Sequence, residues 1–565
     1  MNRKIYGIVA LTFVLSGVVG VCAQSGSTPK ITQTGIQTQR PTPSSTLTIL
    51  IADLQRPNWI NYFGGMGSNM CYASWAEYLL CREPITGELI PGLSERWEVS
   101  QDGKTIDFYL RKGVPFHDGW GEMTAEDVVW CLEKTMGPTA KATVTGVLRE
   151  AISRVEMVDR YHIRLHLKKP NRELLYRLSN WLWDMEISCK KYVEAKGEPY
   201  AASHPIGTGP YKFVECVPGD HVTMTAVDYW HWRATPYYKT VIVKEVPEAS
   251  TRLSMMARGQ GDWADMSLSL KGEAEKMGVK LFKVPLSAYY FIDFGGAPLE
   301  PVVPEAKNYD PSVPWAQGND PKALKVRKAM ALAIDYDSII KGVFQGEAVR
   351  DTGFCTPPGS KWVDPDLIPY KYDPKEAKRL LTEVGYPNGF EKPVIMPKLT
   401  FGGRAETPEV AEAVAMMWET NLGIKCQLRP ITYSVFRDSI TKYLTAWHAT
   451  SYSLPGSFPE PFMAMTRTAA PRLSLVRWML HYNQWEDPVI EIVSTVDEKR
   501  VVELHRKYNR FIHENYVSIP IAAKNGIVPV SDKVAKWGYI PSCINPHNFE
   551  YMYPAGVPYT WSEGK

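Results

Sequence analysis

The stretch of the chain whose side chains are best suited to hold a ligand runs from residue 447 to residue 454. Aromatic rings can stack on a sugar or an apolar group, and hydroxyl groups both donate and accept hydrogen bonds. A neutral, hydroxylated ligand such as an oligosaccharide would suit this combination. The candidate ligand-binding residues here are Trp447, His448, Thr450, Ser451 and Tyr452.

Two further stretches contain aromatic and acidic side chains of types that could contact a ligand. One contains a cluster of glycines near the start of the chain, and the other is an aromatic run with the composition of a strand. They contribute Trp59, Tyr62, Phe63, Asp293 and Phe294. Aromatic residues in strands belong to the core more often than not. Packing is therefore the alternative interpretation for these residues, and also for the tryptophan of the first stretch.

The chain contains no sequence motif of a known catalytic site. A nucleophile elbow, an HExxH zinc motif, a phosphate loop, a dinucleotide fingerprint and an EF-hand loop are all absent. His513-Glu514 lacks a second histidine, and the nine cysteines show neither a CxxC pair nor the spacing of a zinc site. A triad assembled in space from scattered residues stays open. The motifs therefore give no sign of catalysis, of a cofactor or of a resident metal.

Composition narrows the class of protein. The chain has 565 residues, of which 44% are hydrophobic, and a net charge of +3 from 64 basic and 61 acidic residues. This length allows two or three structural domains. The balanced charge and the lack of a long basic run argue against a nucleic-acid binder. The 18 tryptophans and 30 tyrosines are mostly core residues, but a cleft for sugars or apolar side chains also needs aromatic rings.

The N-terminus indicates export. A short basic segment, Asn2 to Lys4, precedes an apolar run from Ile8 to Val21 that is too short to span a bilayer comfortably. The sequence favours signal-peptide cleavage after Ala23 over lipidation of Cys22, because Val21 stands where a lipobox has Gly or Ala. No other apolar run approaches the length of a membrane-spanning helix. Cleavage would leave eight cysteines in an oxidising compartment, where disulfides can form.

The clearest local structure lies between residues 91 and 138. Apolar and polar residues alternate on both sides of Asp102-Gly103, which predicts a hairpin of two strands joined by a tight turn. Thr124, with Asp127 three residues later and an apolar run behind it, predicts the start of a helix. Strand and helix patterns alternate along much of the chain, which indicates an α/β fold.

The same block resembles the signature region of the family 5 extracytoplasmic solute-binding proteins, the dipeptide, oligopeptide, nickel and oligosaccharide receptors of ABC importers. Four family motifs occur in order: Leu93 to Trp97, Asp102 to Thr105, Phe116 to Gly119, and Thr124 to Val128. The resemblance continues at PIGTGPY and at VRKAMALAID, and it extends to about residue 535.

The resemblance implies a two-lobed periplasmic-binding-protein fold of the large, class C type, with an extra inserted domain. The expected organisation is a signal peptide over 1–23, a disordered linker over 24–45, a first lobe built from 46–88, 206–297 and 521–565, an inserted domain over 89–205, and a second lobe over 298–520. Such a protein closes around a small solute and delivers it to the permease and ATPase subunits of a membrane importer. Together with the export signal, the resemblance implies a binding protein rather than an enzyme, acting as a monomer at the periplasmic or extracellular face of the envelope. It also implies that the stretch after the first strand and the end of the aromatic run, at Asp293 and Phe294, face the ligand.

One departure from the family bears on the ligand. In peptide-binding members, a loop after the tryptophan of a late strand carries an aspartate that pairs with the α-ammonium of the peptide. No acidic residue occurs between Trp447 and Phe458, although a buried cation needs a charge partner. The departure argues against a free-amine peptide held in the usual way and favours an oligosaccharide.

Other ligands and roles stay open. In the nickel-binding branch a histidine in the cleft helps to hold a metal chelate, which makes His448 a candidate for that role. A lone histidine is more often an ordinary hydrogen-bonding residue. A sensor or scaffold that presents its ligand to a membrane receptor, instead of a permease, is a further alternative.

Overall fold

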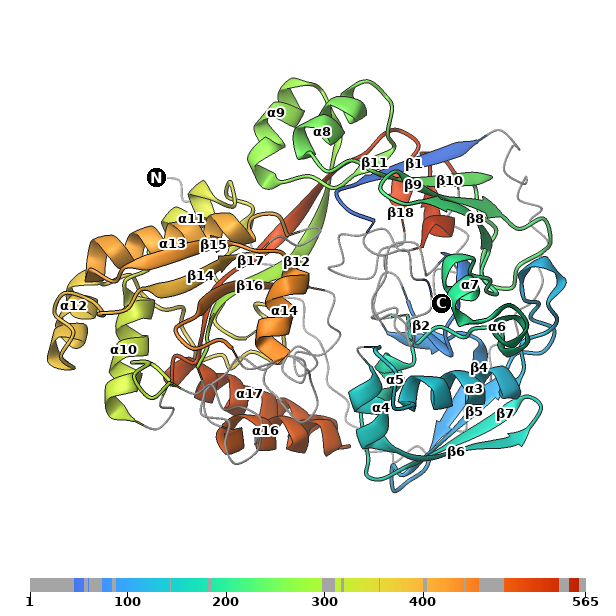
Figure 1. The fold of residues 1–565 in the computed structure, drawn as a ribbon, viewed down its shortest axis with the longest axis horizontal. Coiled ribbons are helices and arrows are strands. Elements are labelled where there is room, and N and C mark those ends of the chain that lie inside the picture. Colours follow the sequence, from blue (N-terminus) through green and yellow to red (C-terminus); the bar gives the residue numbers. More distant parts are fainter. Residues whose placement is uncertain are drawn as a thin grey trace, which may run out of the picture. The chain divides into compact units, whose positions relative to one another are not determined.

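The computed structural model describes residues 45–54, 59, 74–83, 88–142, 144–180, 185–296, 310–316, 320–354, 356–399, 404–441, 444–456, 482–537 and 548–557. All of them belong to one compact unit of the chain, residues 40–565. The described strands form three main sheets, with helices between them in the sequence (Figure 1). The expected α/β fold is confirmed.

The first sheet is mixed and contains five strands. Its order is β11 (Trp263–Ala264), β1 (Thr46–Ile51), β10 (Thr240–Glu245), β9 (His221–Ala226) and β8 (Tyr211–Val217). β1 runs parallel to both of its neighbours, and the other pairs are antiparallel. The helices α8 (Ala249–Ala257) and α9 (Lys271–Lys276) follow β10 and β11 in the chain. β1 coincides with a short, largely apolar stretch, where local hydrophobicity alone predicts a strand.

The second sheet contains four antiparallel strands from one continuous part of the chain. Its order is β4 (Ser94–Val99), β5 (Thr105–Leu110), β7 (His162–Leu167) and β6 (Ile152–Asp159). The helices of this part are α3 (Ala125–Met136), α4 (Thr145–Ala151), α5 (Glu173–Arg177), α6 (Lys190–Lys196) and α7 (Glu198–Ser203).

Both local predictions for this part of the chain are confirmed. Asp102 accepts hydrogen bonds from the backbone of Lys104 and the hydroxyl of Ser100, and Gly103 has a φ of +67° in the turn between β4 and β5. At the start of α3, the Asp127 carboxylate accepts a hydrogen bond from the Thr124 backbone N–H at 3.0 Å. These interactions stabilise a turn and a helix end that the sequence encodes locally.

The third sheet joins strands that are far apart in the sequence. Its order is β13 (Ala348–Val349), β17 (Ser518–Pro529), β12 (Leu281–Phe294) and β16 (Ala449–Pro455), and a separate parallel pair is formed by β14 (Val394–Lys398) and β15 (Cys426–Pro430). The helices are α10 (Pro321–Leu332), α11 (Tyr336–Gly342), α12 (Pro374–Glu383), α13 (Thr407–Leu422), α14 (Tyr433–Thr441), α16 (Tyr482–Ser494) and α17 (Glu498–Glu514). Two short hairpin-like pairs complete the strands, β2 (Leu80–Arg82) with β3 (Leu89–Pro91) and β18 (Lys536–Trp537) with β19 (Met552–Tyr553).

The long strands β12 and β17 belong to two hydrophobic cores at once. Val284 and Val528 are buried in the core of the first sheet, whereas the second half of β12 and the first half of β17 are buried in the core of the third sheet. The second sheet has a core of its own with α3, α4 and α6. Two antiparallel strands therefore connect the first core to the third, as the labelled ribbons of β12 and β17 show in Figure 1.

Candidate ligand-binding site

The stretch with the candidate aromatic and hydroxyl side chains forms the edge of the third sheet. β16 pairs antiparallel with β12, so that Thr450 lies opposite Asp293 and Tyr452 lies opposite Phe291. The structure therefore brings together candidate residues from two stretches that are 157 positions apart in the sequence, as the pair of Asp293 and Thr450 shows. Residues 449–454 are all buried, because β16 is covered on both faces.

Trp447 lies just before β16 and is packed in the core of the third sheet. Its side chain is 9% exposed, and its indole N–H donates a hydrogen bond to Asp310 Oδ2 at 2.9 Å. The ring meets Trp315 edge to face, with centroids 5.7 Å apart, and also contacts Phe390. Of the two interpretations that the sequence left open for this tryptophan, the geometry matches packing rather than an open platform.

His448 is also largely covered. Its Nδ1 lies 2.9 Å from the carbonyl oxygen of Ala446, and burial lowers the pKa of the imidazole. Within the described ranges no group of three or more His, Cys, Asp or Glu side chains is placed to hold a metal ion. The structure thus gives His448 a backbone contact and a place beside Phe436, 6.1 Å between ring centroids.

Asp293 is a fully buried carboxyl in the middle of the third sheet. Its cross-strand neighbours are Thr450 on β16 and Ser518 on β17. Burial raises the pKa of Asp293 to about 7, and the hydroxyl of Ser518 offsets this effect only in part. Burial thus favours the protonated, neutral form of this carboxyl. Phe294, the next residue, is buried on the opposite face against Trp315.

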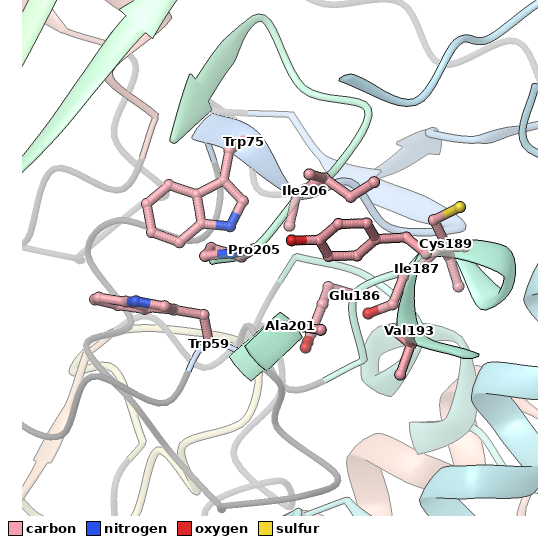
Figure 2. Close-up of a pocket in the computed structure, with 12 residues that line it drawn as sticks. Trp59, Trp75, Glu186, Ile187, Cys189, Val193, Ala201, Pro205 and Ile206 are labelled. Carbon is pink, nitrogen blue, oxygen red and sulfur yellow. The ribbon is translucent and has the colours of Figure 1, made fainter. Parts of the chain in front are cut away.

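Trp59 belongs to the core of the first sheet. Its ring meets Trp75 edge to face at 5.1 Å, with an interplanar angle of 88°, and both rings border a small cavity (Figure 2). The same cavity is lined by Glu186, Cys189 and Tyr192. The space that a water molecule could enter measures about 10 Å³, which is barely enough for one water. This cavity is too small for a peptide or a sugar.

The candidate residues fall into two groups that do not share one cavity. Trp59 lies in the first core, and the candidates from β12 and from residues 447–454 lie in or beside the third. Tyr62 and Phe63 lie outside the described residues. The site is therefore not a single preformed pocket among the residues that the structure describes.

Sequence reasoning missed several partners of the 447–455 stretch. The hydroxyl of Tyr452 donates to the hydroxyl of Tyr433 at 3.2 Å, and Tyr433 is only half-buried. Arg404 donates a hydrogen bond to the carbonyl oxygen of Ser453 at 2.9 Å, and the Asp310 carboxylate accepts one from the indole N–H of Trp447. No local sequence pattern identifies these residues, because each makes its hydrogen bond to a segment that is distant from it in the sequence. Tyr433 at the start of α14 is the aromatic residue of this group that reaches toward solvent.

The chain matches a known family over most of its length. The sequence profile of the bacterial extracellular solute-binding proteins, family 5 Middle, matches residues 88–470. The chain therefore belongs to this family, as the resemblance of its motifs predicted. Heme-binding protein A of Haemophilus influenzae is 25% identical over 83% of this chain and 84% of its own length. The dipeptide-binding protein of Escherichia coli is 26% identical over 82% of this chain and 86% of its own length.

Solved structures share the fold. A periplasmic binding protein, DppA from Helicobacter pylori in complex with the peptide STSA, superposes with a TM-score of 0.75 over 90% of this chain and 98% of that chain, at 22% identity. The oligopeptide-binding protein AppA of Bacillus subtilis, in complex with a nonapeptide, superposes with a TM-score of 0.73. The superposition covers 90% of this chain and 99% of that chain, at 18% identity. These are two-lobed periplasmic binding proteins, which confirms the expected fold class.

The family consists of solute-binding proteins, which are not enzymes, and its members act outside the cytoplasm. Among the residues that the structure describes, no helix combines the length and the apolar character needed to cross a membrane. The expected signal peptide and all but the last residue of the expected linker lie outside the described residues. The chain is thus a family 5 extracellular solute-binding protein.

Proposed function

We propose that this protein is the substrate-binding subunit of an ABC importer that encloses an oligopeptide-class solute and delivers it to a membrane permease and its ATPase. The observation that carries this proposal is the family match over residues 88–470, in a chain whose first and third cores are joined by two long strands. Relatives named as dipeptide-binding and oligopeptide-binding proteins support the peptide class.

The junction of β12 and β17 has the features of a hinge. The pairing of the two strands slips between Val284, opposite Gly526, and Ala288, opposite Lys524, so that three residues of β12 oppose one of β17. Within this bulge Leu286 has a φ of +47° and donates its backbone N–H to the side chain of Asn525 at 3.2 Å. Hinges are short segments that absorb backbone rotation, and a bulge between two cores suits that role.

For the ligand contacts, we propose the side of the third sheet where Tyr433 and Tyr452 meet. Tyr433 supplies a partly exposed aromatic ring and a hydroxyl. The hydroxyl of Tyr452 donates a hydrogen bond to it, and the two rings are in contact. Trp447, His448 and Asp293 would then act from within the core, by fixing the edge strand, and not by touching the ligand. Residues 457–481 follow β16 and lie outside the described residues.

The setting follows from the same proposal. The chain would be exported by its N-terminal segment, act as a monomer at the outer face of the cytoplasmic membrane, and carry out no catalysis. The acid that pairs with a peptide ammonium in relatives would have to come from outside residues 447–456, since none of these residues is acidic. An oligosaccharide would need no such acid and is therefore the competing ligand class.

A thermal-shift screen of the mature protein, residues 24–565, tests this function. The panel would contain di- to hexapeptides, α- and β-linked oligosaccharides, haemin, and nickel with and without histidine. A ligand present at 100 times its Kd stabilises the native state by about 2.7 kcal/mol, which we expect to raise the Tm by about 2 to 5 °C. Peptides should shift the Tm. A shift with sugars alone would contradict the peptide class, and no shift with any solute would contradict the function.

The proposed contact residue can be tested with the same ligand. Tyr433→Ala should weaken binding by more than tenfold, because the loss of an aromatic contact is worth about 1.5 kcal/mol or more. Tyr372→Ala removes a more exposed tyrosine on another part of the chain and is the control. Equal affinities for both variants in isothermal titration would remove Tyr433 from the site.

A further inference from the structure

Two parts of the chain with separate cores touch each other beside α5. Arg172, which immediately precedes α5, donates its backbone N–H to the carbonyl oxygen of Val493 at 3.0 Å. Its guanidinium donates to the carbonyl oxygen of Val496 at 3.4 Å and to the carboxylate of Glu498 at 2.8 Å. These three acceptors lie at the end of α16, between the two helices and at the start of α17, respectively. A single residue of the second-sheet part thus makes three hydrogen bonds to the third-sheet part.

An aromatic contact adds to this interaction. Tyr176 lies four residues after Arg172, and side chains at this spacing lie on the same side of a helix. It is half-buried and packs against the core of the third sheet, although its own helix belongs to the second-sheet part of the chain. The edge of α5 therefore presents a cation and an aromatic ring to the same surface.

The electrostatics of the contact favour the paired state. Glu498 is shared by Arg172 and by Lys361, whose ammonium lies 2.5 Å from the other carboxylate oxygen. Partial burial opposes ionisation of Glu498, yet the hydrogen bonds from Lys361 and Arg172 keep its pKa below the usual value. The arginine side chain is 18% exposed and the glutamate 51%. Each part of this contact can therefore be rehydrated at modest cost when it opens.

We infer that Arg172, Tyr176 and Glu498 form a latch between the second-sheet and third-sheet parts of the chain, which releases when these two parts separate. The inference rests on the proposed hinge-closing function. Rotation about the β12–β17 bulge would move the third core relative to the first, and the contact beside α5 would have to break. A contact present in only one of two states shifts their populations by its own free energy. The latch therefore raises ligand affinity without touching the ligand.

Two variants and a control test the latch. Arg172→Ala removes the guanidinium bonds, and the charge exchange Arg172→Glu with Glu498→Arg restores an ion pair of reversed polarity. Arg379→Ala is the control, because Arg379 pairs only with Glu376 and Glu383 of its own helix in the part of the chain described. Small-angle X-ray scattering would give the radius of gyration with and without ligand. Isothermal titration would give the Kd for the solute that shifts the Tm of the wild type.

The expected results are specific to a latch. Arg172→Ala should weaken binding about three- to tenfold and enlarge the ligand-free protein, the exchange should recover part of both, and Arg379→Ala should match the wild type. A wild-type affinity and radius for Arg172→Ala would overturn the latch while leaving the importer function intact. If no solute binds, an unchanged ligand-free radius overturns the latch, and an enlarged one supports it even though the proposed function fails.

Discussion

A buried carboxyl group lies on each face of β12, and the two groups have opposite electrostatic surroundings. On one face, Glu406 accepts hydrogen bonds from Lys524 at 2.5 Å, from the Tyr290 hydroxyl at 2.8 Å and from the Leu268 backbone at 3.0 Å. On the other face, three residues along from Tyr290, Asp293 has only hydroxyl-bearing neighbours across the sheet. Both carboxyl groups are completely covered by protein.

Their pKa values diverge for a physical reason. Burial disfavours the charged form of both groups, but for Glu406 the ammonium of Lys524 and the hydrogen bonds outweigh it, and the pKa is lowered. Asp293 has no cation beside it among the causes of its shift, and burial raises its pKa to about 7. The comparison teaches that the Lys524 ammonium on β17 favours the charged form of Glu406, whereas Asp293, which has no such partner among the described residues, is shifted toward its neutral form.

The largest effect is expected from removing that cation. Lys524→Met should lower the free energy of unfolding by about 3 to 5 kcal/mol, because it leaves a buried carboxylate without its partner. Guanidinium unfolding would measure the loss. Lys533→Met, at a half-exposed pair with Asp262, is the control and should cost less than about 1 kcal/mol. Similar losses for the two variants would mean that the buried pair has no special role.

The second prediction concerns pH and Asp293. The carboxyl has a higher pKa in the folded state than in the unfolded state, so its contribution to stability is complete below about pH 4 and is lost as the pH rises through about 7. The loss should be about 1.4 kcal/mol per pH unit between pH 5 and 7. Asp293→Asn should remove this slope in unfolding experiments from pH 5 to 8.

Asp351 provides a comparison for the same experiment. It is also buried, and its pKa is raised to about 8, so Asp351→Asn should remove a slope that reaches to higher pH. If Asp293→Asn kept the full slope of the wild type between pH 5 and 7, the buried carboxyl would have to be ionised in the folded protein.

A third carboxylate, near the surface, extends the comparison to a group for which a smaller loss of stability is expected. Asp310 accepts hydrogen bonds from Ser312, Trp447 and Lys392, which hold its pKa well below the usual range. Trp447→Phe keeps a ring in the core but removes the indole N–H, and should cost about 1 to 2 kcal/mol. Trp230→Phe, at a side chain that is 76% exposed, should change nothing. A loss of ligand affinity with unchanged stability would restore the platform role of Trp447.

The smallest effect is expected from Thr450, opposite Asp293. Its hydroxyl makes no hydrogen bond to any residue that the structure describes. Thr450→Val keeps the shape and removes a buried polar group, so unfolding should show a change within about 1 kcal/mol, in the stabilising direction. A loss of 2 kcal/mol or more would instead place a hydrogen bond between this hydroxyl and the Asp293 carboxyl.

The sequence predictions were accurate where the interacting residues are close in the sequence and incomplete where they are far apart. The turn at Asp102-Gly103 and the start of α3 at Thr124 depend on partners two or three residues away, and both were predicted. The role of Trp447 depends on Asp310 and Trp315, more than 130 residues earlier, and was left open. The aromatic run 288–294 was expected as a strand, but β12 begins seven residues earlier, at Leu281, because pairing with β17 extends it.

The sequence by itself determined the family, the α/β class and the local elements, because hydrophobic periodicity, turn residues and motif order are properties of neighbouring residues. Only the tertiary structure decided which candidate side chains are open and which are core. It placed Trp447 against Asp310, put Asp293 opposite Thr450, and brought Arg172 to Glu498. Each of these contacts joins residues more than 130 positions apart, and burial and charge pairing at that range are fixed by packing alone.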